Sequence, residues 1–189
     1  MEIDAIKKKV LEDVDPETRR KKKKEMRIQR LIVTLQFLGI AAVVILIFYI
    51  LMGISTVDGN SMYPTLHDKD IVIYNRRCKE YKAGDIVAIA RPSGEDYVKR
   101  VIAVAGDMVN IQDGKVYVNG EEVRYDGEIG TTEKKSSKIT YPLRVGDKEV
   151  FVLGDNREVS RDSREIGTVK VSDIEGKIEW YMGCLLYTS

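Results

Sequence analysis

The chain has 189 residues, enough for one ordinary domain with attachments. Its 31 Lys and Arg residues nearly balance 30 Asp and Glu residues, giving a net charge of +1. This balance argues against a surface built as a whole to bind nucleic acid. Two cysteines and one histidine exclude a disulfide scaffold, a four-thiolate zinc site and a histidine-rich metal centre. No metal ion and no cofactor is therefore expected.

The charges are unevenly distributed along the chain. Residues 1–30 carry 11 basic and 7 acidic residues, a local net charge of +4, which leaves −3 for the remainder. The excess lies in Arg19–Arg30, where eight positive charges accompany only Glu25. Such a run could bind nucleic acid, but its position directly before an apolar stretch favours a role in membrane topology, with contact to anionic lipid.

The apolar stretch is Leu31–Val57, 27 residues without a charge. A helix of about 24 residues is about 36 Å long and crosses a hydrocarbon layer of about 30 Å with some tilt. The alternatives are a buried core helix, which is rarely apolar all round, and a cleaved signal peptide, which is shorter and precedes a small-residue cleavage site. We expect an uncleaved transmembrane anchor over 31–57. By the positive-inside rule, residues 1–30 are cytoplasmic and 58–189 extracytoplasmic.

The outer part, residues 58–189, contains short apolar runs separated by turn residues and no sustained helical period. The turn dipeptides Asp113-Gly114 and Asn119-Gly120 bracket one of the runs, as in β-hairpins. We therefore expect a mainly β fold, an antiparallel β-rich domain behind a single helix. The expected strands are Ile71–Tyr74, Asp85–Ala90, Tyr97–Ala105, Met108–Ile111, Val116–Val118, Val150–Leu153 and Lys177–Met182.

Three outer features carry no assigned function. Thr131–Lys138 has no apolar residue and predicts an exposed loop. The tail, residues 183–189, ends abruptly after the last expected strand. Cys78 and Cys184 both lie on the outer side, and the sequence leaves open whether they pair, with two free thiols preferred.

Ser61 is the first candidate for chemistry. It lies in Gly59-Asn-Ser-Met-Tyr-Pro-Thr65, directly after the apolar stretch. Gly59 and Pro64 bend the chain on either side, which would present the hydroxyl in an accessible, irregular segment. A serine in such a setting is usually part of a turn, so this segment alone does not establish a nucleophile. A Ser-His-Asp triad could use only His67, which lies in a polar turn.

Lys99 is the second candidate, because it interrupts the apolar strand Tyr97–Ala105. Alternation places it on the face of Val101 and Ala103, with Arg100 on the other face. It is either an edge-strand lysine at the water boundary or a desolvated amine. A general base must be neutral, and lowering its pKa from about 10.4 to about 7–8 corresponds to about 3–5 kcal/mol. Apolar neighbours can supply that amount, and Ser-Lys pairs are a known route to hydroxyl activation.

The third feature is Gly154–Gly167, GDNREVSRDSREIG, a glycine-bounded loop crowded with Asp, Ser and Arg. It is either a polar turn or a set of groups that orient other side chains. Together with SMYPTL at 61–66, GDIVAIA at 84–90 and KRVIAVAGD at 99–107, it resembles the bacterial type I signal peptidases. These are membrane-bound Ser-Lys endopeptidases that remove signal peptides from exported proteins. The resemblance covers residues 19 to about 182.

The resemblance implies a role for each matching residue. Ser61 would be the nucleophile and Lys99 its general base, with Met62 shaping the substrate cleft. Ser160 would orient the amine through a hydrogen bond. Asp162 and Arg164 would form a supporting ion pair beside Ser163. The implied fold is a β-rich catalytic core with a smaller β-extension at about 110–148. The implied partners are preprotein signal peptides and the lipid membrane but not nucleic acid, with the export machinery as a further candidate.

One position departs from some family members. They carry a serine two residues before the nucleophile, whose hydroxyl helps to form the oxyanion hole, and here that residue is Gly59. The hole would then rely on backbone N–H groups, most plausibly that of Ser61. Two other interpretations compete. A self-cleaving repressor relative predicts a helix-turn-helix and a cytoplasmic chain, whereas a membrane-tethered binding domain has no need of Ser61, Lys99 and Ser160 together.

Overall fold

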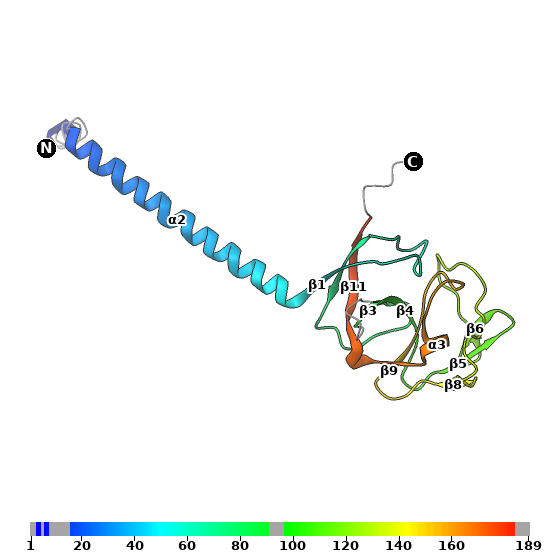
Figure 1. Cartoon of the computed structure of the whole chain (residues 1–189). Coiled ribbons are helices and arrows are strands. Elements are labelled where there is room, and N and C mark those ends of the chain that lie inside the picture. The colour runs from blue at the N-terminus through cyan, green and yellow to red at the C-terminus, as the bar shows by residue number, and fades with distance from the viewer. Residues whose placement is uncertain (1–2, 5, 8–15, 91–96, 184–189) are drawn as a thin grey trace, which may run out of the picture. The chain divides into compact units, whose positions relative to one another are not determined.

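The computed structural model describes residues 3–4, 6–7, 16–90 and 97–183. It divides into two compact units, residues 1–48 and 49–189. The first unit consists mainly of helix α2 (Pro16–Leu51), and the second is β-rich (Figure 1). Cys184 and residues 184–189 of the tail lie outside the described residues. Cys78 forms no disulfide within the described part of the chain.

Helix α2 has no buried residue. Among the described residues it is the one helix long and apolar enough to cross a membrane. It ends at Leu51, and Met52–Thr56 forms strand β1, so the span expected to reach Val57 is too long by six residues. The reason is pairing: β1 forms an antiparallel ladder with β2 (Ile71–Asn75), from Met52 opposite Asn75 to Thr56 opposite Ile71. The 21 residues from 31 to 51 still measure about 32 Å as a helix.

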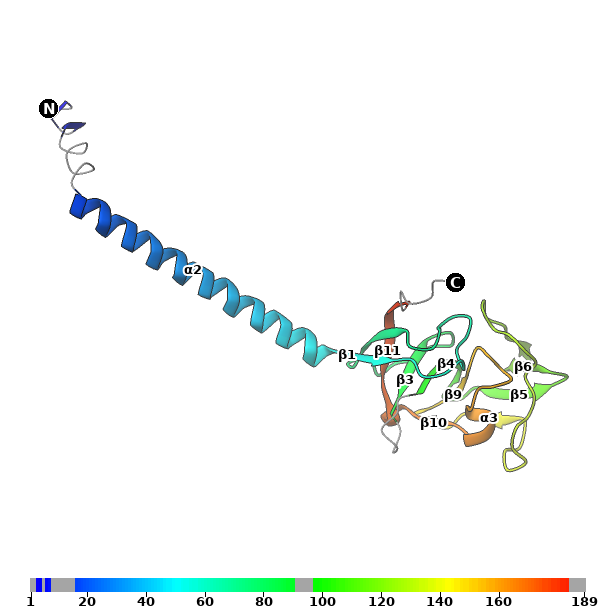
Figure 2. The same ribbon diagram turned by 45° about the horizontal axis from the view of Figure 1, so that its top comes forward.

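The larger sheet has seven strands in the order β1-β2-β11-β3-β4-β9-β10, all antiparallel. The last long strand of the chain, β11, lies between β2 and β3, which come much earlier in the sequence. Figures 1 and 2 show this sheet beside a smaller one. The remaining strands of the larger sheet are β3 (Ile86–Ile89), β4 (Tyr97–Val104), β9 (Glu149–Leu153), β10 (Val169–Lys170) and β11 (Ile174–Met182).

The smaller sheet has the order β7-β6-β5-β8 and is formed between Met108 and Arg144, within the region where the extension is expected. Both predicted hairpin turns are present. Asp113-Gly114 and Asn119-Gly120 have positive φ at both residues, the conformation that two-residue hairpins favour. The strands are β5 (Met108–Gln112), β6 (Lys115–Val118), β7 (Glu121–Glu122) and β8 (Leu143–Arg144).

Three apolar clusters form the core. One joins the two sheets, because Phe151 and Leu153 of β9 pack with Val109 and Ile111 of β5. A second lies among β3, β4 and β9, and the third holds the segment after β1. All seven predicted strands are present. The sequence did not predict β1, the two-residue strands or the short helix α3 (Ser163–Ile166).

Candidate active site

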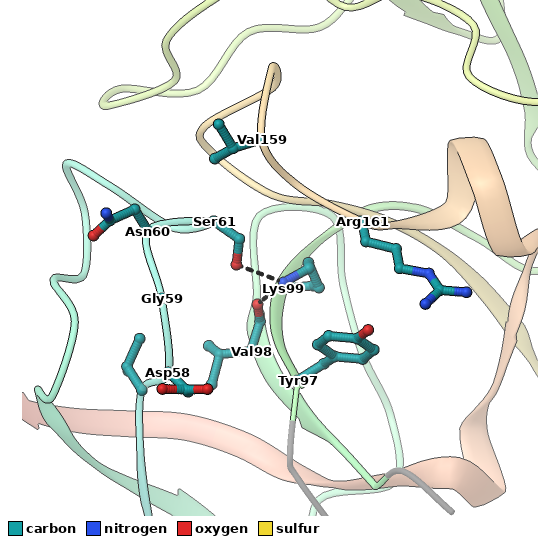
Figure 3. A pocket seen from close by; sticks show the side chains of 10 residues that line it. Asp58, Gly59, Asn60, Ser61, Tyr97, Val98, Lys99, Val159 and Arg161 are labelled. Atoms are coloured by element: carbon teal, nitrogen blue, oxygen red, sulfur yellow. Dashed lines mark hydrogen bonds between the residues drawn. The ribbon is translucent and has the colours of Figure 1, made fainter. Parts of the chain in front are cut away.

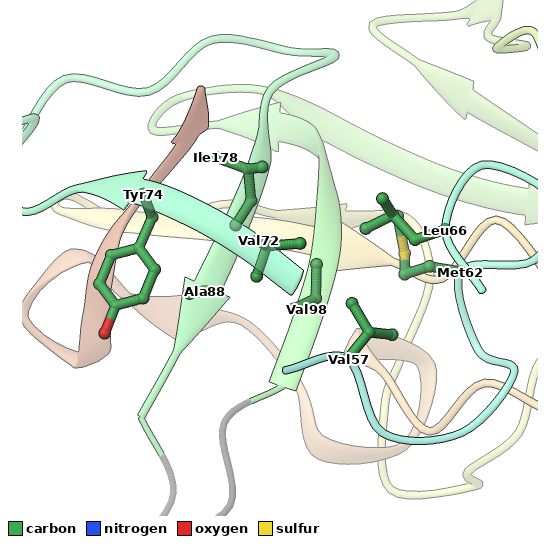
Figure 4. Packing of buried hydrophobic residues seen from close by; sticks show 8 residues of the cluster. All are labelled: Val57, Met62, Leu66, Val72, Tyr74, Ala88, Val98 and Ile178. Carbon is green, nitrogen blue, oxygen red and sulfur yellow. The ribbon is translucent and has the colours of Figure 1, made fainter. Parts of the chain in front are cut away.

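The segment that carries Ser61 is a turn between β1 and β2 that is fastened to the core on one side. Met62 and Leu66 are fully buried in the third cluster, together with Val57 and Val98 (Figure 4). Burial contributes about 1.5–3 kcal/mol for each such side chain. The Leu66 N–H also donates to the Met62 carbonyl at 2.9 Å. The turn is therefore fixed, with Ser61 at its partly exposed edge.

Met62 has a different place from the one expected. The resemblance assigned it to the substrate cleft, but its side chain is completely buried and does not line the cavity beside Ser61. An apolar side chain at this position gains more from packing against Val57 and Val98 than from facing water. In this structure Met62 anchors the turn that carries Ser61.

Lys99 lies in β4, with β3 on one side and β9 on the other. This interior position excludes the edge-strand interpretation. Its side chain is only 2% exposed. The predicted alternation of side chains along β4 continues to Val101 but not to Ala103. The pairing of β4 with β9 shifts register between these two residues, and their side chains belong to different apolar clusters.

The structure brings Ser61 and Lys99 together across 38 positions of sequence. Lys99 Nζ donates to Ser61 Oγ at 2.7 Å and to the Val98 carbonyl at 2.7 Å (Figure 3). The ring of Tyr97 lies 5.0 Å from the same nitrogen. A nucleophilic hydroxyl and a buried amine at hydrogen-bond distance are the two groups that base-assisted acyl transfer requires.

The pair opens into a cavity of about 350 Å³. Figure 3 shows Ser61 and Lys99 pointing toward one another within it. A cavity of this volume is within the range of ligand-binding clefts. The lining residues are Val57, Asp58, Gly59, Asn60, Ser61, Tyr97, Val98, Lys99, Val159 and Arg161.

The loop after β9 reaches this cavity because of strand register. Leu153, the last residue of β9, lies opposite Arg100, so the residue that follows it, Gly154, lies beside Lys99. The Asn156 N–H donates to the Ser61 carbonyl at 3.1 Å. A Cβ on Gly154 would lie 2.5 Å from the same carbonyl oxygen, so only glycine permits this approach.

Asp162 and Arg164 form the ion pair that the resemblance implies. Both are fully buried, and the guanidinium donates to both carboxylate oxygens at 2.8 Å. Burial alone would raise the pKa of Asp162, but the hydrogen bonds and charge of Arg164 hold it below its ordinary value. Beside the pair, Ser163 Oγ accepts the Val152 N–H at 2.9 Å, which ties α3 to β9.

Ser160 is buried near Gly154, as expected for a residue of the site. Its side chain interacts with Asp162, whose pKa it helps to lower, and the predicted hydrogen bond from Ser160 Oγ to Lys99 is not formed within the described residues. The amine is instead directed to Ser61 and to Val98. The backbone carbonyl of Ser160 accepts hydrogen bonds from Lys135 and Arg164.

Sequence reasoning missed one link. Arg100, adjacent to Lys99, donates to both oxygens of Asp155 at 2.8 and 2.6 Å. Asp155 is 1% exposed and also accepts a hydrogen bond from Thr65 of the turn that carries Ser61. Asp155 therefore connects the strand of Lys99 to the segment of Ser61. The signal in the sequence was Arg100 itself, a second charged residue in an apolar strand, which needs an acidic partner such as Asp155 if it is buried.

His67 has no part in the Ser61 contact. Its ring lies edge-on to Tyr63, and Nδ1 lies 3.7 Å from Asp70. Its side chain is 53% exposed. Among the residues that the structure describes, no group of three or more His, Cys, Asp or Glu side chains is placed to hold a metal ion.

Comparison with known proteins identifies the class. The family model for signal peptidases, peptidase S26, matches residues 28–182, and the chain belongs to this family. Its relatives include signal peptidase I of Bacillus amyloliquefaciens, 38% identical over 57% of this chain and 63% of that protein. Signal peptidase I of Bacillus caldolyticus is 36% identical over 66% of this chain and 75% of that protein.

Coverage of these relatives is partial. The chain spans just under two thirds of the first two relatives, the second being signal peptidase I S of Bacillus subtilis at 64%. A solved signal peptidase I from Enterococcus faecalis V583 is 30% identical, with 52% of this chain and 96% of that chain covered and a TM-score of 0.44.

The buried ion pair yields a prediction about stability. Asp162→Asn removes one charge of the pair and should lower the unfolding free energy by about 3–5 kcal/mol near neutral pH. Because the pKa of Asp162 is lowered on folding, its contribution is present above its ordinary value of 3.8 and is lost as the pH falls through the folded value.

Denaturant unfolding of the full chain in detergent, at several pH values, measures this effect. The difference between the wild type and Asp162→Asn should shrink as the pH falls from about 5 to about 2. The exposed Asp126 offers a matched control, and Asp126→Asn should leave stability nearly unchanged. A pH-independent difference would contradict the role of the ionised pair.

Proposed function

We propose that this chain is a membrane-bound serine endopeptidase that removes N-terminal signal peptides from exported preproteins. The observation that carries the proposal is the 2.7 Å contact between Ser61 Oγ and the buried amine of Lys99. Membership of the signal peptidase family gives the substrate class. The names of the similar Bacillus proteins, signal peptidase I, support the same reaction.

Ser61 is the nucleophile and Lys99 the general base in this proposal. The neutral amine accepts the Ser61 hydroxyl proton as Oγ attacks the scissile carbonyl carbon, which gives a tetrahedral intermediate. The amine then passes this proton to the amino group of the mature protein as the C–N bond breaks, and the signal peptide remains linked to Ser61 as an ester. A water molecule, deprotonated by the same amine, hydrolyses the ester and releases the signal peptide.

Burial is what makes Lys99 a base. Removing an ammonium group from water disfavours its charged form by up to several kcal/mol. The ring of Tyr97 favours the charged form, but a cation–π contact contributes only about 0.5–2 kcal/mol. Burial is the larger effect, and a neutral amine accepts the Ser61 proton across the observed 2.7 Å.

The tetrahedral intermediate needs donors for its oxyanion. The Ser61 N–H is the proposed donor, since Gly59 supplies no hydroxyl. Gly59 has a positive φ of 77°, and its N–H donates to Asp68 at 2.7 Å. Any other residue at this position would be strained, so the glycine fixes the backbone next to the nucleophile.

The supporting residues are assigned by position. Asp162, Ser163 and Arg164 hold the loop after β9, and Ser160 lies next to Gly154 beside Lys99. The preprotein binds as an extended segment, with small side chains before the cleavage point. The cavity beside Ser61 and Lys99 supports this assignment by its size and place.

Membrane topology completes the proposal. Arg19–Arg30 stays in the cytoplasm, Leu31–Leu51 crosses the membrane and residues 58–189 are extracytoplasmic. The uncharged helix and the basic run before it support this arrangement. Signal peptides emerge on the outer side of the membrane, where the catalytic domain would then lie. The lipid bilayer and the preprotein are the proposed partners.

Substitution of either member of the pair should abolish preprotein cleavage. Ser61→Ala removes the nucleophile and Lys99→Met removes the base while keeping the length of the side chain. We expect losses of at least about 10³-fold for each in detergent, measured by gel shift of a preprotein. The double variant should be no worse than either single variant. Turnover retained by Lys99→Met would reject the mechanism, and turnover retained by Ser61→Ala would reject the function.

The rate should rise with pH. Lys99 acts only when neutral, so kcat/KM should increase to a plateau as the pH goes from about 6 to about 9. Lys99→Arg should be inactive at every pH, because a guanidinium stays charged. Both are measured with a fluorogenic signal-peptide substrate. A flat profile for the wild type would contradict a lysine base.

Cys78 provides a test of topology. In a Cys184→Ser background, a membrane-impermeant maleimide should label Cys78 in intact spheroplasts, because residues 58–189 lie outside. A cysteine introduced as Lys23→Cys in a variant without Cys78 is the matched control. It should be labelled only after lysis. The opposite labelling pattern would overturn the proposed orientation.

A further inference from the structure

A segment of the extension, residues 125–135, lies against the loop that reaches the active site. We call residues 125–135 the strap and residues 154–160 the site loop. The Ile129 N–H donates to the Asp155 carbonyl at 2.8 Å, and the Arg157 N–H donates to the Ile129 carbonyl at 2.9 Å. Ile129 and Asn156 form a parallel bridge. The strap and the site loop are therefore joined by backbone hydrogen bonds.

Buried guanidinium groups hold the site loop from within. Arg157, 1% exposed, donates to Thr132 Oγ1 at 2.5 Å and to Glu128 at 2.7 Å. Arg164 donates to the Arg157 carbonyl at 2.6 Å. Thr132 is itself 2% exposed, so the predicted exposed loop Thr131–Lys138 is wrong at this residue. Its burial is explained by its bond to Arg157.

The end of the site loop is held from the solvent side by Lys135. Its Nζ donates to the Ser160 carbonyl at 2.7 Å and to the Glu158 carbonyl at 3.1 Å. These two carbonyls flank Val159, which lines the cavity with Ser61 and Lys99. An ammonium group that binds two backbone carbonyls fixes the local backbone, whereas an ordinary surface lysine pairs loosely with a carboxylate.

The position of Val159 depends on the hydrogen bonds of Lys135, because its own side chain is not packed in the core. Its side chain is 63% exposed, although it forms part of the cavity wall. The Ser160 N–H donates to the Asn156 carbonyl at 3.1 Å, which closes the inner side of the same turn. The backbone on both sides of Val159 is thus positioned by hydrogen bonds, and Lys135 supplies two of them.

We propose that Lys135 is a positioning residue that sets the substrate-facing wall at Val159, and that it thereby controls substrate binding more than the chemical step. The inference rests on the proposed peptidase function. Ser61 and Lys99 are held by the core, by strand β4 and by the first residues of the site loop, Asp155 and Asn156. They therefore do not depend on the Glu158 and Ser160 carbonyls that Lys135 binds. The cavity wall at Val159 does depend on Lys135, which binds the carbonyls on both sides of it. Loss of the ammonium should therefore affect KM and leave kcat nearly unchanged.

The test compares three variants of the full chain in detergent with a signal-peptide substrate. Lys135→Met removes the donor and should raise KM about 5- to 10-fold, with kcat within about 2-fold of the wild type. Lys135→Arg keeps a donor for the two carbonyls and should restore most of the affinity. Lys138→Met changes the charge of the same loop by the same amount at an exposed position and should match the wild type.

The outcomes separate this inference from the proposed function. An unchanged KM in Lys135→Met would overturn the inference, and so would a lower kcat that parallels a lower Tm at constant KM, since that result describes general destabilisation. An equal rise in KM for Lys138→Met would mean that net charge, and not the contact of Lys135, sets KM, and would also overturn the inference. A wild type no more active than Ser61→Ala would reject the peptidase function, and this inference with it.

Discussion

The structure of the site depends on a lysine placed where an ammonium group is disfavoured. Lys99 is 2% exposed in an interior strand, and it donates hydrogen bonds of 2.7 Å to the neutral oxygens of Ser61 and Val98. A protonated amine in such a position costs several kcal/mol relative to water. Burial favours the neutral amine, and a neutral amine is what the proposed chemistry requires, so the cost of burying Lys99 and its proposed role have one origin. The surrounding fold has to keep Ser61 within reach of that nitrogen.

Two links meet that requirement. Met62 and Leu66 fasten the turn that carries Ser61 to the core, next to Val98 of β4. Asp155 then connects the turn of Ser61 to the strand of Lys99, because Thr65 and Arg100 both donate hydrogen bonds to its carboxylate. Arg100 follows Lys99 directly in β4. A shift of either segment would break a buried charge-assisted hydrogen bond, which is the kind of contact that costs most to lose.

The sequence predicted the parts of this structure that local patterns encode. Alternation and turn dipeptides located seven strands and two hairpins, and a lysine in an apolar strand identified Lys99. Strand β1 could not be found this way, because Met52–Thr56 is as uncharged as the helix before it and is defined by pairing with β2. The contact of Lys135 is equally non-local. Hydrogen bonds to backbone carbonyls 23 and 25 residues away leave no pattern in the sequence.

The strap explains how an extension can influence a site from which its strands are distant. The extension is inserted between β4 and β9, and the chain leaves and re-enters where Val104 lies opposite Val150. The site lies at the other end of this pair, where Arg100 is opposite Leu153. A compact hairpin sheet alone would remain at the far end. Residues 125–135 return along the sheet instead, and their hydrogen bonds to Asp155, Arg157 and Ser160 connect the extension to the loop beside Ser61 and Lys99.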